Sequence, residues 1–199
     1  MKITLIGGGK LGKQLYSVCA AASEIELVQW VVRSAERGKT PEGISLVNEV
    51  NELHPADLYL LAVTDQAIPK VAAALPEEAF VAHTAGGVAI EVLNQNRAGV
   101  FYPLQTFSEG RNIDFSKLPI GLESKDASDL PLLEQLVQAL GARSFHMNSK
   151  QREHLHLAAV LVNNFTNHLF AEAASICSQN YLPFELLNPL IQETVFKLE

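Results

Sequence analysis

The chain has 199 residues, of which 48% are hydrophobic and 19% charged, a composition typical of a globular protein rather than a disordered or fibrous one. Its 22 Asp and Glu residues outnumber 15 Lys and Arg, and the net charge of −7 disfavours general binding to nucleic acid or to an anionic membrane. No apolar run reaches the roughly 18 residues of a membrane span, and no signal peptide is recognisable, so a cytoplasmic protein is expected. The two cysteines, Cys19 and Cys177, form neither a disulfide framework nor a metal motif.

Short apolar runs alternate with helical stretches up to about residue 147. The runs expected to be strands are 3–6, 27–32, 58–63, 80–83, 99–102, 120–123 and 143–147. Helical spacing of apolar residues is found between them, around 11–18, 68–75 and 132–140. Apolar runs bounded by turn residues and separated by helices are typical of buried parallel strands. The sequence therefore predicts an α/β fold of the Rossmann type, with a doubly wound, mostly parallel sheet.

After residue 147 the strand pattern ends. Asn148, followed three residues later by Gln151, predicts the start of a helix that meets no breaker until Asn180 and Pro183. Spacings of four and three residues, typical of a helix packed lengthwise on another, relate Leu155, Ala159, Val162, Thr166, Leu169, Ala173 and Ile176. Because its other faces are also apolar, this helix is expected to be buried between domains or subunits. We predict a Rossmann domain over 1–147 and a smaller all-helical domain over 148–199.

Three glycines follow the first strand in a GxGxxG pattern. Gly7 suits a tight turn, Gly9 lets the backbone approach a pyrophosphate, and Gly12 allows close packing of helix on strand. The helix that begins at Lys10 and Leu11 presents free N–H groups and a positive dipole end to phosphates. The loop therefore predicts dinucleotide binding. A merely glycine-rich turn is the alternative.

The same loop also spells GxxxxGK from Gly7 to Lys13, the beginning of a nucleotide-triphosphate loop. That motif requires Ser or Thr at the next position to bind magnesium, and here the residue is Gln14. The triphosphatase interpretation is therefore disfavoured.

The end of the second strand discriminates between dinucleotide cofactors. An acid there binds the ribose 2′-hydroxyl of NAD, whereas a cation accommodates the 2′-phosphate of NADP. Here the residues are Arg33 and Ser34, with Arg37 and Lys39 just beyond. NADP is the expected cofactor, unless Arg33 is simply a surface arginine.

Two later strand ends are expected to border the nicotinamide, because ligands of open α/β sheets lie beyond the carboxyl ends of the strands. The residues there are Val63 and Thr64, then His83 and Thr84. His83 is a candidate to donate a proton or orient a carbonyl, although a histidine at a strand end is often hydrogen-bonded to backbone.

The long helix contains a second set of candidates. On an ideal helix Arg152, His156, Asn163 and Asn167 fall within about 60° of one another. Such a polar stripe either contacts a ligand or forms a structural network. In the ligand interpretation His156 or His83 transfers a proton, Asn163 orients the substrate and Arg152 attracts a carboxylate. No cluster of His, Cys and acids has metal-ligand spacing.

Several segments resemble a known family. They are His83-Thr84-Ala85-Gly86, the run 99–107 (GVFYPLQTF), Gln151-Arg152, and the runs 156–160 and 163–168. The chain resembles the Rossmann-like plus DUF2520 family of proposed NADP oxidoreductases, distant relatives of pyrroline-5-carboxylate reductase and 6-phosphogluconate dehydrogenase. The resemblance implies an NADP-binding domain, a helical domain, a cleft between them and a homodimer formed through the helices. It also implies several further helices, so the helical part is expected to be truncated, with Leu198-Glu199 as a possible cloning remnant.

We therefore predict an NADP(H)-dependent oxidoreductase that transfers a hydride to or from a small carbonyl or imine compound. The alternative is a non-catalytic NADP-binding sensor or assembly protein, because no strong proton-transfer pair such as Tyr-x-x-x-Lys is evident. Neither the substrate nor the direction of the reaction is indicated by the residues.

Overall fold

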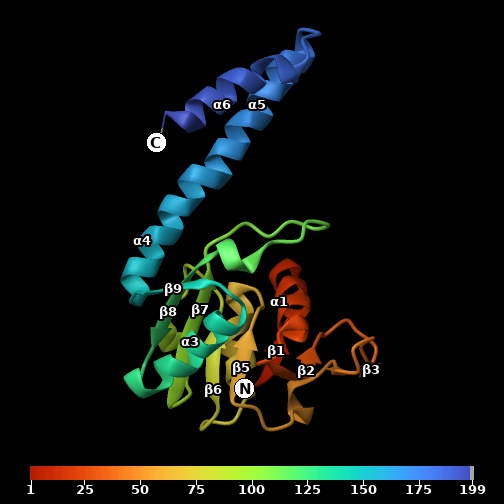
Figure 1. The fold of residues 1–199 in the computed structure, drawn as a ribbon, viewed down its shortest axis with the longest axis vertical. Helices are drawn as coiled ribbons and strands as arrows, with labels where there is room; N and C mark the ends of the chain where they lie inside the picture. The colour runs from red at the N-terminus through yellow and green to blue at the C-terminus, as the bar shows by residue number, and fades with distance from the viewer. Residues whose placement is uncertain (198–199) are drawn as a thin grey trace. The chain divides into compact units, whose positions relative to one another are not determined.

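The computed structural model describes residues 1–197 and divides the chain into two compact units (Figure 1). The first is Met1–His156 and the second begins at Leu157. Leu198 and Glu199, which the sequence marked as a possible cloning remnant, lie outside the described residues.

The first unit is built around a nine-stranded sheet with the order β3-β4-β2-β1-β5-β6-β7-β8-β9. The strands are β1 (Lys2–Ile6), β2 (Glu26–Val31), β3 (Gly38–Lys39), β4 (Ser45–Val47), β5 (Leu58–Leu61), β6 (Phe80–His83), β7 (Arg97–Pro103), β8 (Pro119–Ser124) and β9 (Arg143–His146). Neighbouring strands are parallel except for the β3–β4 and β7–β8 pairs. The predicted α/β fold with a mostly parallel sheet is therefore confirmed.

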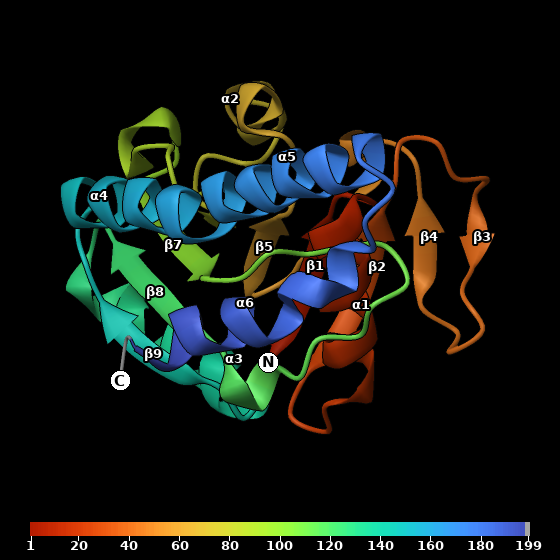
Figure 2. The same cartoon turned by 90° about the horizontal axis from the view of Figure 1, so that it is seen from above.

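Every apolar run expected to be a strand forms one, from β1 to β9. The expected burial is wrong for β9, which lies at an edge of the sheet and is exposed at all four residues. The sequence did not indicate β3 and β4, which lie together at one edge of the sheet (Figure 2). These strands have two and three residues, too few for the period-two alternation by which a strand is recognised.

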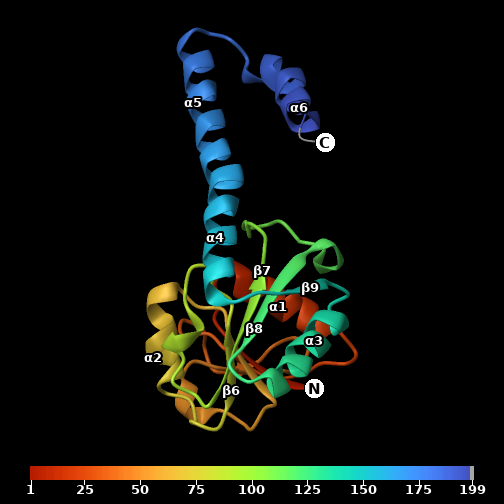
Figure 3. The same ribbon diagram turned by 90° about the vertical axis from the view of Figure 1, so that its left-hand side faces the viewer.

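Helices cover both faces of the sheet: α1 (Lys10–Ala21) and α3 (Leu130–Ala139) lie on one face and α2 (Ile68–Ala72) on the other (Figure 3). Successive residues of a strand point to opposite faces, and in β5 Leu60 packs in the core under α1 and α3 whereas Leu61 packs in the core under α2. Burial on both sides explains why β5 is apolar throughout.

The remaining ordered turns are short 3₁₀ helices: Val50–Glu52, Asp65–Ala67, Ile90–Val92, Phe115–Lys117, Ala127–Asp129 and Phe184–Leu187. The helix α4 (Ser149–Ala159) begins where the sequence predicts it. The Asn148 side chain accepts a hydrogen bond from the Gln151 N–H at 2.9 Å, and the Gln151 side chain accepts one from the Asn148 N–H at 3.0 Å. This reciprocal capping box fixes the first turn of α4.

The helical segment then continues as a π-helix (Val160–Phe165) and as α5 (Thr166–Gln179). A π-helix bonds residue i to i+5 and so departs from the 3.6-residue period, which interrupts the uniform spacing of four and three that we predicted. Tyr181 has a φ of 55° in the turn that leads to α6 (Asn188–Phe196). Large apolar side chains of the second unit are exposed within this chain, for example Val162 at 75% and Leu169 at 65%.

Candidate functional site

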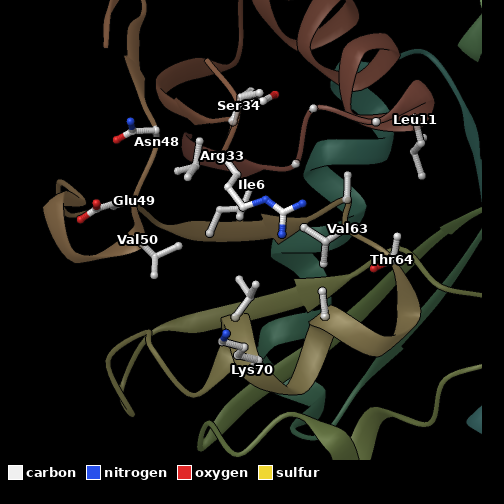
Figure 4. Close-up of a pocket in the computed structure, with 18 of the residues that line it drawn as sticks. Ile6, Leu11, Arg33, Ser34, Asn48, Glu49, Val50, Val63, Thr64 and Lys70 are labelled. Atoms are coloured by element: carbon white, nitrogen blue, oxygen red, sulfur yellow. The ribbon is translucent and has the colours of Figure 1, made fainter. Parts of the chain in front are cut away.

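A cavity of about 880 Å³ opens in the first unit at the carboxyl ends of β1, β2 and β5 (Figure 4). Its lining residues are Ile6, Gly7, Gly8, Gly9, Lys10, Leu11, Val31, Val32, Arg33, Ser34, Asn48, Glu49, Val50, Asn51, Ala62, Val63, Thr64, Ala67, Lys70, Val71 and Thr84. Nine of the eleven residues predicted to bind the cofactor are among them; Gly12 and His83 are not. The cavity lies where doubly wound sheets bind their ligands.

The three motif glycines are required for different reasons. Gly7 has a φ of 128°, and a Cβ there would lie 2.0 Å from the Ala62 carbonyl oxygen. A Cβ on Gly12 would lie 2.2 Å from the Gly7 carbonyl oxygen, so these two glycines allow the loop, helix and strand to pack. A Cβ on Gly9 would meet nothing within 4 Å. The missing side chain of Gly9 therefore leaves open space beside the start of α1, which protein packing does not use.

The start of α1 is suited to an anion. Gly9 is the N-cap residue and offers no side-chain cap, and the first turn contains no acidic residue. The first N–H groups of a helix lack internal partners and carry the positive end of its dipole. The cavity wall formed by Gly9, Lys10 and Leu11 can therefore hold a phosphate group.

Trp30 holds this loop in place, a function that sequence reasoning missed. Its indole N–H donates to the Gly7 carbonyl oxygen at 2.9 Å, and its ring stacks on Tyr16 at a centroid distance of 4.2 Å. The Gly7 N–H donates to the Val31 carbonyl at 2.9 Å. The available signal was the single tryptophan of the chain, located in the strand that pairs with β1.

Gln14 occupies the place of the magnesium-binding hydroxyl in the triphosphate-loop alternative. Its amide donates to the Arg111 carbonyl oxygen at 2.8 Å and accepts from the Ile113 N–H at 3.2 Å. Gln14 therefore anchors the loop that precedes β8, and a triphosphatase would lack its usual metal hydroxyl here.

The basic residues after β2 differ in their partners. Arg37 forms an ion pair with Glu52 at 2.8 Å and another with Glu49 at 3.9 Å, so it braces the loop after β4. Lys39 does not line the cavity. Arg33 does, and its guanidinium extends across the cavity towards Val63 (Figure 4). Within residues 1–197 the structure gives Arg33 no ion-pair or hydrogen-bond partner, so its charge is available to an anionic ligand.

The opposite wall is formed by Val63, Thr64 and Thr84. The Thr84 hydroxyl donates to the Leu61 carbonyl oxygen at 3.1 Å, which fixes the chain at the point where β6 ends. Their predicted place beside the nicotinamide stays a prediction.

His83 is fully buried and does not line the cavity. Its Nδ1 accepts a hydrogen bond from the Ala85 N–H at 3.2 Å. Burial, assisted by the positive charge of Arg152, lowers the pKa of His83 to about 4, so the ring is neutral near pH 7. This is the backbone-bonded alternative that the sequence left open.

Arg152 is also buried, with 1% of its surface exposed. Its guanidinium forms an ion pair with Glu123 and donates to the Val88 carbonyl oxygen. Ser149, one turn earlier on α4, donates to Glu123 through its N–H at 2.8 Å. Arg152 thus fastens α4 to β8 and to the loop after β6, and in this structure its charge is used within the protein rather than directed at a substrate carboxylate.

His156 contacts Tyr102, near the end of β7, and adjoins Gly86, which follows β6. Its Nδ1 lies 3.0 Å from the Tyr102 hydroxyl, and the two rings cross at 74°. A Cβ on Gly86 would lie 2.5 Å from the same Nδ1 and 2.8 Å from Cε2 of Tyr102. Sequence reasoning selected His156 and assigned no function to Tyr102, which lies near the end of a strand in the family-specific run 99–107. Burial raises the pKa of the Tyr102 phenol, against the opposing charge of Arg152, so the hydroxyl stays protonated near pH 7.

Asn163 and Asn167 belong to the second unit and do not line the cavity. The Asn167 amide donates to Asn163 Oδ1 at 3.3 Å, and Asn163 donates to Asn164 Oδ1 at 2.9 Å. Because Asn163 lies in the π-helical segment, the 100° per residue used to predict the polar stripe does not hold there. The substrate-orienting function of Asn163 stays a prediction.

Within residues 1–197, no three His, Cys, Asp or Glu side chains are grouped so that they could hold a metal ion. None of the helices in this range combines the length and the apolar character needed to cross a membrane.

Comparison with known proteins identifies the family. Residues 118–199 match the model of a domain of unknown function, DUF2520. The structure of BF3122 from Bacteroides fragilis, which is named an NADP oxidoreductase by inference, is similar to this chain. The two sequences are 33% identical, the match covers 99% of this chain and 80% of BF3122, and the TM-score is 0.79. A comparison with curated proteins gives no match.

More distant structures share the fold. The pyrroline carboxylate reductase of Plasmodium falciparum with NADP bound is 14% identical, with 99% of this chain and 76% of that chain covered and a TM-score of 0.67. The reductive aminase of Aspergillus terreus in complex with NADPH and ethyl levulinate is 14% identical, with 99% and 74% covered and a TM-score of 0.76. The BF3122 likeness, the DUF2520 match and the Rossmann sheet agree: the chain belongs to the Rossmann-like plus DUF2520 family.

Proposed function

We propose that the chain is an oxidoreductase that binds NADP(H) in the cavity of its first unit and acts on a small carbonyl or imine compound. One observation carries the proposal. Arg33, which has no ion-pair or hydrogen-bond partner among residues 1–197, extends into a cavity that is also lined by the helix start left open at Gly9. A cation and a set of free N–H groups on the same cavity are the two anion sites that a 2′-phosphorylated dinucleotide requires.

Each part of such a dinucleotide can be assigned to residues that line the cavity. The N–H groups at Gly9, Lys10 and Leu11 would hold the pyrophosphate, and Arg33 with Ser34 would hold the 2′-phosphate. Val63, Thr64 and Thr84 would then border the nicotinamide. When bound, the dinucleotide supplies the two electrons and the hydrogen that reduce a C=N or C=O bond.

The named relatives support the oxidoreductase assignment. BF3122 is named an NADP oxidoreductase by inference, and the fold is shared with a pyrroline carboxylate reductase bound to NADP and a reductive aminase bound to NADPH. Within this chain, His156 is the proposed proton-transfer residue and Asn163 is proposed to orient the substrate nitrogen or oxygen.

Calorimetric titration of Arg33→Ala with NADPH and NADH tests the cofactor assignment. Loss of the charge-assisted bonds to a 2′-phosphate should weaken NADPH binding roughly 10- to 150-fold, because such bonds contribute about 1.5–3 kcal/mol. NADH binding should change by less than about threefold. The control is Lys39→Ala, which removes a nearby cation that does not line the cavity and should change neither affinity.

Equal weakening of NADPH and NADH by Arg33→Ala would contradict the 2′-phosphate assignment, and no binding of either dinucleotide would overturn the proposed function. Turnover is tested by NADPH oxidation with a panel of keto acids, cyclic imines and aldehydes. Tight binding without oxidation of NADPH on any of them would favour the sensor alternative.

A further inference from the structure

The contact between Tyr102 and His156 lies immediately beyond the cavity. Thr84 lines the cavity, and Gly86, two residues later, touches both rings of the pair. Two residues of extended chain span at most about 7 Å. The His156 ring, which Gly86 adjoins, therefore lies near the part of the cavity wall formed by Thr84.

The pair is held in place by two structural features, one on each residue's side. Tyr102 stands on β7, which is hydrogen-bonded to β6 along the register that joins Val100 to His83. His156 stands on α4, one turn after Arg152, whose guanidinium fastens that helix to Glu123 of β8. The geometry between the two rings is therefore set by the sheet and by the buried ion pair.

The two nitrogens of His156 are in different surroundings. Nδ1 is joined to the Tyr102 hydroxyl, and the ring as a whole is only partly buried, whereas Tyr102 is 6% exposed. The hydrogen bond made at one ring nitrogen determines which nitrogen serves a ligand. Nε2 is thus the nitrogen left for a substrate.

We propose that Tyr102 and His156 form the proton-delivery pair of this site, with His156 Nε2 as the donor and Tyr102 as the positioning residue. The inference rests on the proposed function and extends it, since it assigns the delivering atom, its orienting partner and the glycine that makes room for them.

Reduction of an imine adds a hydride to the carbon and a proton to the nitrogen of its C=N bond. The carbon receives a hydrogen with two electrons from the reduced dinucleotide, and the π pair of the C=N bond forms a new N–H bond with the proton of His156 Nε2–H. That N–H bond of the imidazolium breaks, the ring is left neutral with Nδ1 held by Tyr102, and solvent restores the proton. A carbonyl compound gives an alcohol in the same way, with an O–H bond in place of N–H.

The proposal predicts a proton-linked difference between the two redox forms of the cofactor. An imidazolium beside the nicotinamide repels the positively charged ring of NADP⁺ more than the neutral ring of NADPH. Calorimetric titrations should show the affinity ratio of NADPH to NADP⁺ rising roughly tenfold between pH 8 and pH 5, the range in which histidines titrate.

The charged and titratable neighbours of His156 are not expected to cause the same pH dependence of the affinity ratio. Tyr102 on β7 stays protonated, because burial raises its pKa, and His83 on β6 titrates at about 4, below the range. Arg152 on α4 and Glu123 on β8 are paired with each other. The control for other histidines is His154→Gln on the same helix, whose wild-type Nδ1 lies 2.6 Å from the Lys150 carbonyl oxygen.

The variants are arranged in matched pairs. His156→Gln should make the affinity ratio independent of pH, whereas His154→Gln should keep the wild-type dependence. Gly86→Ala, at a position without a positive φ, should displace the His156 ring and reduce the dependence below twofold. Gly87→Ala adds a Cβ that would lie 3.7 Å from His156 Cδ2, an ordinary contact, and should behave as wild type.

Tyr102→Phe tests the positioning function. It removes the hydroxyl that accepts from the imidazolium, and a bond to a charged donor is stronger than one to a neutral ring, so the midpoint of the pH dependence should move to lower pH. Nitrogen-15 NMR of the ring in the cofactor-free protein follows the same change directly. The inference is overturned if wild type shows no pH dependence of the ratio, if Gly86→Ala matches Gly87→Ala, or if Tyr102→Phe leaves both the midpoint and the ring nitrogens unchanged. Absence of any dinucleotide binding would overturn the proposed function instead, while the NMR comparison would still test the pair.

Discussion

At the scale of residues, some glycines of the site serve packing within the protein and others leave space for a ligand. Gly12 is close to the Gly7 carbonyl oxygen and serves the packing of α1 on β1, whereas Gly9 faces open space at the start of α1. Both are glycines of one motif, for which the sequence predicts helix–strand packing at Gly12 and close approach of a pyrophosphate at Gly9. The distances around each ideal Cβ show that only Gly9 leaves room that the protein itself does not need.

This difference predicts opposite phenotypes for two small substitutions. Gly12→Ala should destabilise the fold by about 1–3 kcal/mol, because its methyl group overlaps the Gly7 carbonyl oxygen. Gly9→Ala should change stability by less than about 0.5 kcal/mol, since its φ of −71° suits alanine, yet weaken NADPH binding at least about tenfold. Urea denaturation and calorimetry measure the two effects. A Gly9→Ala protein that binds NADPH as tightly as wild type would show that the cofactor does not occupy the open space beside Gly9.

At the scale of elements, α4 is fixed mainly at its beginning. The capping box between Asn148 and Gln151 closes its first turn, and the Arg152–Glu123 ion pair fastens the next turn to β8. The capping residues could be predicted from the sequence because their hydrogen bonds join residues only three positions apart. The ion pair could not, because Glu123 is 29 residues away from Arg152. The parallel pairing of β8 with β9, which places Leu122 beside His146, brings Glu123 to the start of α4.

Removal of the cap should weaken this anchor measurably. Asn148→Ala is expected to lower the free energy of unfolding by about 0.5–2 kcal/mol, as for other N-cap substitutions, while Asn148→Ser retains a side-chain acceptor and should lose much less. Urea unfolding followed by circular dichroism distinguishes them. Equal losses in the two variants would mean that the Asn148 side chain contributes through something other than the cap.

At the scale of the whole molecule, the second unit exposes more apolar surface than a solitary helical segment tolerates. Its exposed large apolar side chains include Leu157, Leu161, Val162, Phe165, Leu169, Ile176, Leu182, Leu186, Leu190, Val195 and Phe196. Extended apolar surfaces of this kind mark association sites. We propose that a second copy of this chain covers them, because a two-fold dimer buries the same surface on both partners.

Light scattering coupled to size-exclusion chromatography tests the proposed homodimer. Wild type should elute at twice the mass of one chain, and Leu169→Glu should shift the protein towards the monomer because it places a charge in an apolar interface. Glu172→Gln, an exposed polar change on the same helix, should leave the dimer intact. A monomeric wild type would contradict self-association and leave the apolar surface to a different partner.

The sequence by itself determined where most strands lie along the chain, the glycine loop, the start of α4 and the family. It could do so because periodicity, turn chemistry and capping act over a few residues. Only the tertiary structure decided which candidates have protein partners. Among residues 1–197 it placed Arg33 in the cavity without one, paired Arg152 with Glu123, buried His83 and joined Tyr102 to His156. It also revealed the π-helical segment that ideal helical spacing could not anticipate. The reason is physical: the availability of a charged or titratable group depends on what surrounds it, and those surroundings come from strands far apart in the chain.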